Sequence, residues 1–223
     1  MTVPSKKPRK PRRSKAAIEQ AVLDAVHSLI EEVGFSKVTL TGIAARAEIE
    51  PTVFYRRYSN LDELFEIYTH KYDFWFAGVA ELMPPDLSPE ESMKWVLTNL
   101  ARALHKNKGM QQLLIWELSD INPITRRTAT LREKINESLI KELDKQFNMS
   151  GVDLNVLSAL IISGIYYLIL HRDISTFCNV DFNSKAGRAR LESTISQLVD
   201  IIFACVRQQQ HAHIVPKEIA KTN

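Results

Sequence analysis

The sequence predicts an all-α protein of about nine helices. Apolar residues recur every three or four positions along most of the 223-residue chain, which is the period of a helix that buries one face. No segment alternates apolar and polar residues in the manner of a half-buried strand. Because 45% of the residues are hydrophobic, the chain has enough apolar material for a buried core. We therefore expect a small N-terminal helical unit followed by a larger helical unit.

The chain begins with a basic segment that is predicted to be a disordered arm. Residues 1–13 are rich in proline and positive charge and show no apolar periodicity. Residues 1–15 carry seven basic side chains and no acidic one, whereas residues 16–70 carry four basic and nine acidic ones. Any attraction of the N-terminal unit to a polyanion must therefore come from the arm and from a few well-placed arginines.

The first helix is predicted from Ser14 to about Val33. Ser14 is a suitable N-cap, and apolar residues follow it at helical spacing. Gly34 is expected to end the helix in a left-handed conformation, with Phe35 closing over the last turn.

Residues 39–64 have the outline of a helix-turn-helix that is followed at once by a further helix. Ile43, Ala44 and Ala47 place apolar atoms on one face of the first short helix. Pro51 stands where a second helix would begin, because its fixed φ suits a first helical turn.

The second helix of this motif is predicted to present a polar face. Val53 and Phe54 are expected to turn inward, and the ring of Tyr55 to pack partly under the helix with its hydroxyl near a phosphate. The outward side chains are of the types that contact phosphates and base edges: Thr52, Tyr55 and Arg56. Adjacent residues on a helix point about 100° apart. Only one of Arg56 and Arg57 can then read bases, so we assign base contact to Arg56 and phosphate contact to Arg57.

The same residues resemble the DNA-binding domain of the tetracycline-repressor (TetR) family of bacterial regulators. The resemblance runs through Thr39, Ile43-Ala44, Ile49, Tyr55 and the segment Tyr58-x-Asn60-x-x-Glu63-Leu64. It implies a dimeric transcriptional repressor whose C-terminal helices hold a small-molecule pocket. In such a mechanism, a ligand shifts the long helix that begins at Leu61 and changes the separation of the two recognition helices.

Three residues depart from the family's pattern. Glu48 stands where the family usually has a turn glycine, so either the turn is reshaped or a non-glycine residue accepts a positive φ. Glu50 replaces a capping serine, and Leu61 replaces a lysine that grips a phosphate. The last two substitutions bear on the affinity for DNA rather than on the fold.

The candidate DNA-binding residues come from the motif, the resemblance and the arm. They are Lys37, Thr39, Thr41, Pro51, Thr52, Tyr55, Arg56 and Arg57, with Arg12 and Arg13 from the arm. Thr39 is first of all an N-cap, to which a phosphate contact would be added. Three roles fit the arm: a minor-groove tail, a membrane-surface patch or a solubilising extension. Its direct connection to a DNA-binding unit favours the first role, and no apolar face adjoins it for a membrane.

Six further helices are predicted after the motif. Asn60 and Glu63 suggest a capping box for a long helix from Leu61 to about Leu82, which Pro84-Pro85 ends. The others are expected at 89–106, in a short segment after a break at Gly109, at 123–147, at 153–171 and at 184–209. The predicted domains are the arm (1–13), the helix-turn-helix domain (14–70), a ligand-binding and dimerisation domain (71–209) and a polar tail (210–223).

The last two long helices are predicted to form a homodimer interface. Residues 156–170 are apolar nearly all round but fall short of the roughly 20 residues needed to span a bilayer, so a buried helix is favoured and no membrane partner is expected. Ala159, Ser163 and Gly164 permit close helix approach, and the stripe from Leu191 to Val206 offers a second apolar surface. A two-fold four-helix interface would bury both surfaces.

The candidate ligand-binding residues are the aromatic and histidine side chains of the C-terminal domain: Trp95, His105, Trp116, Tyr166, Tyr167 and His171. The alternative is that they belong to the core, as aromatic residues at helical spacing usually do. The expected ligand is a small apolar or amphipathic molecule. His211-x-His213 could bind a metal weakly, but its polar surroundings favour a simple tail.

The sequence offers no positive support for an enzyme, because it contains no nucleophile elbow, phosphate loop or paired catalytic carboxylates. No cofactor and no metal are expected. Two distant cysteines and the lack of an apolar signal segment favour the cytoplasm. We therefore expect a ligand-responsive, dimeric repressor that binds a pseudo-palindromic site in double-stranded DNA. One rival is a helical interaction or membrane-surface protein that uses the arm without reading sequence; a carrier or enzyme built on the same helices is another.

Overall fold

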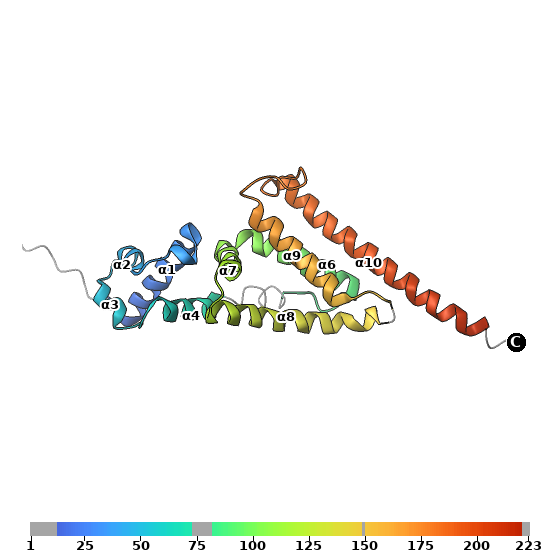
Figure 1. Ribbon diagram of the computed structural model, residues 1–223, viewed down its shortest axis with the longest axis horizontal. Coiled ribbons are helices and arrows are strands. Elements are labelled where there is room, and N and C mark those ends of the chain that lie inside the picture. Colours follow the sequence, from blue (N-terminus) through green and yellow to red (C-terminus); the bar gives the residue numbers. More distant parts are fainter. Residues whose placement is uncertain (1–12, 73–81, 149, 220–223) are drawn as a thin grey trace, which may run out of the picture. The chain divides into compact units, whose positions relative to one another are not determined.

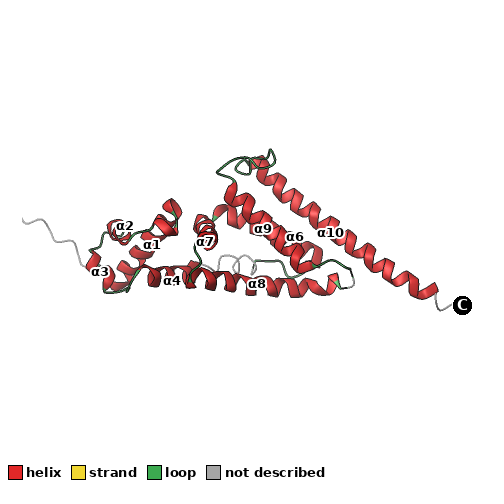
Figure 2. Cartoon of the chain, in the orientation of Figure 1, coloured by secondary structure: helices red, strands yellow, loops and turns green. Residues whose placement is uncertain are grey.

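The structure is a computed structural model that describes residues 13–72, 82–148 and 150–219. The described residues form nine α-helices and one 3-10 helix, with no strand beyond an isolated bridge between Phe177 and Val180 (Figures 1 and 2). The predicted all-α fold class is confirmed. The chain divides into two compact units, with the boundary between Tyr68 and Thr69.

The N-terminal unit is built from short helices with well-defined starts. It contains α1 (Lys15–Val33), the 3-10 helix η1 (Phe35–Lys37), α2 (Leu40–Arg46), α3 (Pro51–Tyr55) and most of α4 (Leu61–Tyr72). Ser14, Thr39 and Asn60 cap α1, α2 and α4. Each accepts a hydrogen bond from the backbone N–H three residues later, at 2.8 to 3.1 Å, and so satisfies a donor that the helix itself leaves free.

A mixed aromatic and aliphatic core holds these helices together. The ring of Phe35 lies edge-on to Phe65, with the centroids 5.4 Å apart, and Phe54 contacts Tyr58 at 5.1 Å. The fully buried apolar residues of this unit are Val22, Val26, Ile30, Ile43, Phe54 and Leu64. Burial of each such side chain contributes about 1.5–3 kcal/mol, which is how helices of five and seven residues keep their positions.

The C-terminal unit is organised around α6. It contains the end of α4, α6 (Pro89–Lys106), α7 (Lys108–Ser119), α8 (Pro123–Phe147), α9 (Leu154–His171) and α10 (Lys185–Ile219). The central helix α6 packs against each of the four helices that follow it. Ser88 and Asn122 form capping boxes directly before a proline at the first helical position. The predicted starts at 89 and 123 are therefore confirmed.

The α6–α10 contact combines an apolar seam with ion pairs. The pairs Glu90–Arg207 at 2.8 Å, Lys94–Asp200 and Arg102–Glu192 at 2.6 Å follow the two helices in opposite order, so α6 and α10 run antiparallel. Leu97 and Leu104 on α6 and Val199 and Phe203 on α10 are all buried. These pairs are partly exposed, so they set the register of the helices more than they stabilise them.

Several predicted helix ends need correction. Gly34 has the expected positive φ of 78°, but its ψ of 162° is extended rather than left-handed helical. Gly109 does not break a helix: the break is at Asn107, whose side chain caps α7 through Met110 N–H, and Gly109 lies in the first turn. Leu82 is in a turn, while most of the second half of the predicted helix, residues 73–81, lies outside the described residues. α10 continues ten residues beyond the predicted end at Gln209, so much of the predicted polar tail is helical.

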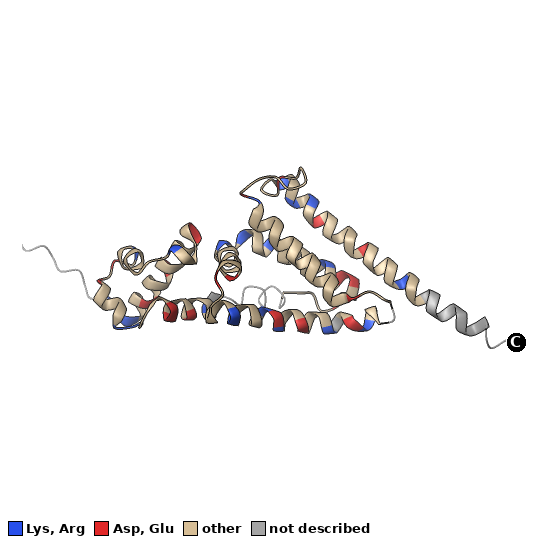
Figure 3. Ribbon diagram, viewed as in Figure 1, with Lys and Arg blue, Asp and Glu red and all other residues tan. Residues whose placement is uncertain are grey.

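The prediction that α9 is a buried helix does not hold for a single chain. Only 28% of its apolar 18-residue window is buried, although by length and composition this helix could cross a membrane. It carries no lysine, arginine, aspartate or glutamate along its length (Figure 3). Val156, Leu160 and Tyr167 are exposed on it, because α6 and α8 cover only one side.

Candidate functional site

The turn between α2 and α3 is a tight helix-ending motif built around Glu48. The N–H of Ile49 donates to Ala44 O at 3.0 Å, and the N–H of Glu48 donates to Ala45 O at 3.3 Å. This pair of bonds defines a Schellman motif, whose C′ position is usually glycine. Glu48 occupies that position with φ 51°. Of the two outcomes considered for this residue, the turn is kept and a non-glycine residue accepts the left-handed conformation.

Helix α3 begins and ends within five residues. Pro51 is its first residue, and Glu50 is at the N-cap position but makes no side-chain hydrogen bond there. Phe54 is fully buried and anchors the helix, whereas Val53 is only half-buried. Pro51, Thr52, Tyr55 and Arg56 are all exposed. The predicted outward face of the second helix therefore exists.

Tyr55 is more exposed than the sequence suggested. Its side chain is 62% exposed, and its ring meets Phe54 only edge-on, with the centroids 5.7 Å apart. Phe54, not Tyr55, is the buried aromatic side chain of this helix, and it contacts Tyr58. Both the ring and the hydroxyl of Tyr55 are accessible to a partner.

The basic side chains of this unit differ in whether other residues already hold them in hydrogen bonds or ion pairs. Arg46 is held in a bidentate pair with Glu32, at 2.5 and 2.8 Å, and this hydrogen bonding lowers the pKa of the Glu32 carboxyl. Arg57 is half-buried, with Nη1 3.5 Å from Val53 O. Arg56 is exposed, and its side chain makes no hydrogen bond or ion pair with another described residue. The assignment of Arg56 to bases and Arg57 to backbone phosphates agrees with this difference but stays a prediction.

Arg13 has a role that the sequence did not suggest. Its Nη1 donates to Ala47 O at 2.7 Å, and Nη2 lies 3.6 Å from the carboxylate of Glu48. It thus satisfies the last carbonyl of the Schellman turn instead of extending away with the arm. Arg12 and the remainder of the arm lie outside the described residues.

The other candidate contacts surround the start of α2. Lys37, Thr39 and Thr41 are exposed. Thr39 Oγ1 accepts the N–H of Gly42, which leaves its hydroxyl hydrogen available for an acceptor such as a phosphate oxygen. The starts of α2 and α3 and these exposed side chains all belong to the N-terminal unit.

Helix α4 is bonded within both units. In the N-terminal unit, Tyr68 Oη lies 2.8 Å from His27 Nδ1 on α1. In the C-terminal unit, Arg127 Nη2 on α8 donates to Thr69 Oγ1 at 2.8 Å. Tyr68 and Thr69 are both buried. Neither bond was predicted, since a sequence pattern does not show which distant side chains meet.

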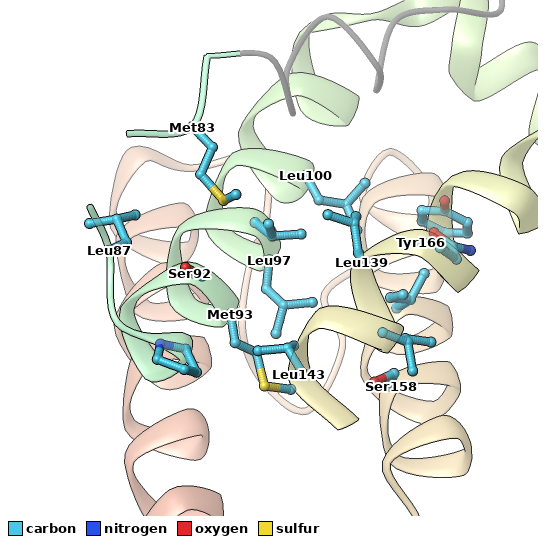
Figure 4. Close-up of a pocket in the computed structure, with 15 residues that line it drawn as sticks. Met83, Leu87, Ser92, Met93, Leu97, Leu100, Leu139, Leu143, Ser158 and Tyr166 are labelled. Atoms are coloured by element: carbon cyan, nitrogen blue, oxygen red, sulfur yellow. The ribbon is translucent and has the colours of Figure 1, made fainter. Parts of the chain in front are cut away.

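The C-terminal unit contains an apolar cavity of about 240 Å³ between α6, α8 and α9 (Figure 4). Its polar lining residues are Ser92, Asn136, Ser158 and Tyr166, and none of the described lining residues is charged. The remainder of the lining is aliphatic or sulfur-containing: Met83, Leu87, Pro89, Met93, Val96, Leu97, Leu100, Leu139, Ile140, Leu143 and Ile162. Such a lining selects apolar molecules and orients them through a few hydrogen bonds.

Of the six predicted ligand residues, Tyr166 lines this cavity. Trp116 is buried and its Nε1 donates to Asp120 at 3.1 Å, as expected if this residue belongs to the core. Tyr167 and His171 stack on one another near the surface, 5.2 Å apart, and His105 lines a separate cavity. Trp95 is half-buried and lines neither. The aliphatic lining was missed because such residues look the same in a core and in a cavity.

The N-terminal unit matches a known family of proteins. Residues 22–67 match the family described as bacterial regulatory proteins, tetR family. A search of curated proteins found no match to this sequence.

Solved structures resemble the chain over most of its length. One is a TetR-like transcriptional regulator from Rhodococcus sp. RHA1, with TM-score 0.60, 20% identity and coverage of 83% of this chain and 97% of that one. Another is the fatty acid degradation regulator FadR from Bacillus halodurans, with TM-score 0.63, 16% identity and coverage of 84% and 96%. A third is a putative fatty acid metabolism regulator from Clostridium perfringens, with TM-score 0.59, 15% identity and coverage of 80% and 96%.

The fold consists of a helix-turn-helix unit followed by a larger helical unit. Residues 22–67 match the TetR-family model, and the chain as a whole shares the fold of solved TetR-type regulators.

Proposed function

We propose that this protein is a ligand-responsive repressor that binds a pseudo-palindromic DNA operator as a homodimer. The observation that carries the proposal is the exposed face of α3. Thr52, Tyr55 and Arg56 are exposed there while Phe54 anchors the helix in the core. This arrangement presents donors to phosphates and base edges from a rigid support.

The charge distribution indicates how DNA affinity is obtained. Four basic residues against nine acidic ones in residues 16–70 give little general attraction to DNA, and Arg46 is already paired with Glu32. Affinity should therefore depend on the basic arm, on Arg56 and Arg57, and on the two helix starts. A protein with this balance would need correct base contacts for tight binding, which favours sequence-specific recognition over general binding.

The exposed faces of α9 and α10 support a homodimer. On α9, Val156, Leu160 and Tyr167 are exposed together with the small residues Ala159, Ser163 and Gly164. On α10, Leu198 and Ile201 are exposed. Exposed apolar side chains at helical spacing, next to small residues, suit a symmetric helix-to-helix contact. A second copy of the chain is therefore the partner that we propose for these two helices.

The cavity between α6, α8 and α9 is the proposed effector site. Because no described lining residue is charged, a buried carboxylate or ammonium would lack compensation there. The proposed effector is an elongated apolar molecule with a neutral polar group near Tyr166, Ser158 or Asn136. Two similar structures are described as regulators of fatty acid degradation or metabolism, which makes molecules with an acyl chain the first class to screen.

The proposed switch is a shift in population between two arrangements of the chain. Helix α4 belongs to both units and is bonded in each, through Tyr68 and Thr69. A ligand that prefers one arrangement of the C-terminal unit would change operator affinity by no more than its differential affinity for the two states. We also propose that the protein acts in the cytoplasm, and that it binds DNA and a small apolar ligand without acting as an enzyme.

Selection of bound sequences from random duplex DNA tests the proposal. We expect an enriched palindrome, with each half matching one recognition helix. Arg56→Ala provides the matched control, because it removes the proposed base contact from an exposed position. Enrichment of no sequence, or equal binding to the selected and scrambled duplexes at moderate salt, would contradict the proposal. Preference for anionic vesicles over duplex would support the membrane-surface rival.

A further inference from the structure

A second cavity in the C-terminal unit is separate from the apolar one and has a different chemistry. It measures about 260 Å³ and lies between the end of α6, the end of α9, the following loop and the start of α10. Its charged and titratable lining residues are Arg102, His105, Lys106, Arg188 and Glu192. Its apolar lining residues are Ala101, Ile169, Phe182 and Leu191.

The charges of this cavity do not cancel. Arg102 Nη2 donates to Glu192 at 2.6 Å, and this bond lowers the pKa of the Glu192 carboxyl, which keeps it ionised and paired. Lys106 is exposed and makes no ion pair with any described residue. Arg188 is half-buried and donates to a backbone carbonyl, that of Asn183. When Glu192 is counted against Arg102, Lys106 and Arg188 leave the cavity with a net positive charge, although Glu192 also interacts electrostatically with Arg188.

A third positive charge lies directly behind His105. Arg172 is only 9% exposed, and its Nη1 donates to His105 Nδ1 at 2.7 Å and to His105 O at 3.1 Å. Its Nε has no hydrogen-bond partner among the described residues, and the carboxylate of Asp173 is 3.9 Å away and exposed. Arg172 Nη2 also donates to Gln111 Oε1 at 3.4 Å, but this neutral acceptor does not offset the charge, so Arg172 raises the positive potential around His105.

The pKa of His105 responds to this positive potential. Because the guanidinium of Arg172 can only donate, His105 Nδ1 must accept, so its proton lies on Nε2. Burial, and then the positive charges of Arg172, Arg188 and Lys106, lower the pKa of His105, against an opposing effect of Asp173. The imidazole is therefore neutral at pH 7 and offers one N–H donor.

We propose that this second cavity binds a small organic anion: a carboxylate or phosphate group on a compact apolar body. Arg188 and Lys106 would pair with the anionic oxygens, and charge-assisted hydrogen bonds of this kind are the stronger ones in proteins. Phe182, Leu191 and Ile169 would cover the apolar body. The two cavities thus differ in ligand class, one neutral and elongated, the other anionic and compact.

Calorimetric titration with two probes, benzoate and phenyl phosphate, tests this site in the full-length protein. We expect saturable binding of one anion per chain, weakened by added salt, and preference between the probes decides between carboxylate and phosphate. Benzyl alcohol, which has a similar apolar body without charge, should not bind there. Absence of saturable binding by both anions, or equal binding of benzyl alcohol, would overturn the proposal.

Matched variants locate the binding. Arg188→Gln and Lys106→Gln should each weaken anion binding by about tenfold, as expected for the loss of a charged hydrogen bond. Arg190→Gln and Lys108→Gln, which alter exposed residues that do not line the cavity, should not. Lys106→Gln breaks no hydrogen bond or ion pair of the described residues, so it remains informative if Arg188→Gln disturbs the loop. Unchanged affinity in Lys106→Gln and Arg188→Gln would refute the assignment.

NMR of the His105 imidazole detects anion binding independently of the calorimetric heat. A bound anion should raise the pKa of His105, because a nearby negative charge favours the protonated ring. The shift should be lost in Arg188→Gln and kept in Arg190→Gln. No shift at saturating anion would place the anion elsewhere on the protein. Operator selection is independent of both measurements, so failure here leaves the proposed regulatory function untouched.

Discussion

Glu48 combines backbone strain and an unfavourable charge in one residue. A non-glycine residue in the left-handed conformation costs about 1–2 kcal/mol, and Glu48 has φ 51° in the Schellman turn. Its carboxylate is also close to the surface proposed to meet DNA. Its pair with Arg13, 3.6 Å long and exposed, offsets little of this cost.

Glu48→Gly should raise the free energy of unfolding by about 0.5–1 kcal/mol. Relief of the strain exceeds the extra entropy of a glycine in the unfolded chain, about 0.5–1 kcal/mol. Urea unfolding checks this value. Glu50→Gly is the control, because Glu50 has φ −73° and gains no relief. Glu48→Gln separates charge from strain: it should strengthen DNA binding without raising stability. Equal stability of wild type and Glu48→Gly would show that the turn is unstrained.

Arg56→Ala should cost about 1–3 kcal/mol on the selected operator and relax its base preference. Arg57→Ala should weaken all duplexes alike, since a phosphate contact carries no sequence information. Fluorescence anisotropy with operator and scrambled duplexes distinguishes the two effects. If both variants lose the same affinity on every duplex, Arg56 does not read bases.

At the scale of elements, α7 and α8 are joined by a buried ion pair. Arg132 donates to Glu117, which also accepts from Thr128 Oγ1 at 2.5 Å. The two charged side chains are only 11% and 12% exposed. Such a pair specifies how two helices meet, and removal of one member leaves a buried charge without a partner.

Arg132→Ala should therefore lower the free energy of unfolding by about 3–5 kcal/mol. Lys141→Ala is the matched control on the same helix, because its pair with Glu137 is well exposed and should be worth less than about 1 kcal/mol. Chemical unfolding of the two variants gives the comparison. Similar losses in both would mean that burial of the Glu117–Arg132 pair has no energetic consequence.

Deletion of residues 2–12 should reduce DNA affinity and flatten the dependence of log K on log salt, by about 0.9 for each phosphate that the shortened protein no longer neutralises. The deletion stops before Arg13, because that residue bonds Ala47 O at the end of α2 and its removal would also disturb the turn. Helicity should be unchanged. A truncated protein with the full-length slope would show that the arm is a solubilising extension.

The sequence predicted elements well where local chemistry sets them. Proline predicted the starts of α6 and α8, and in the structure a capping side chain before each proline defines the same starts, so no tertiary information was needed. Asn107 was overlooked because Gly109 looked like the stronger helix breaker, yet Asn107 both ends α6 and caps α7. The cavity depends on three helices meeting at aliphatic side chains, and periodicity within one helix cannot show that. Arg13 was misjudged for a similar reason, since its acceptor is 34 residues away.

At the scale of the whole molecule, the exposed apolar faces predict association. Ile201 is 66% exposed on α10, whereas its neighbour Ile202 is 8% exposed and faces the core. The substitution that tests the dimer is therefore Ile201→Glu. The change suggested by the apolar stripe alone, Ile202→Glu, would test folding instead.

Ile201→Glu should yield a folded monomer, and Ile202→Glu an unfolded or strongly destabilised protein. Sedimentation equilibrium should give about twice 25.5 kDa for the wild type and the monomer mass for Ile201→Glu, with circular dichroism confirming native helicity. A monomeric wild type with native helicity would contradict the homodimer.

One helix borders both cavities. The middle of α6 lines the apolar cavity through Val96, Leu97 and Leu100, and its last turns line the second through Ala101 and His105. Two ligands that each favour a position of α6 must alter one another's affinity by the same factor, whatever the order of binding. Two ligands that favour the same position of α6 would each strengthen the binding of the other. Two ligands that favour opposite positions would each weaken the binding of the other. A single chain of this kind would respond to a combination of two ligands without the help of a second protein.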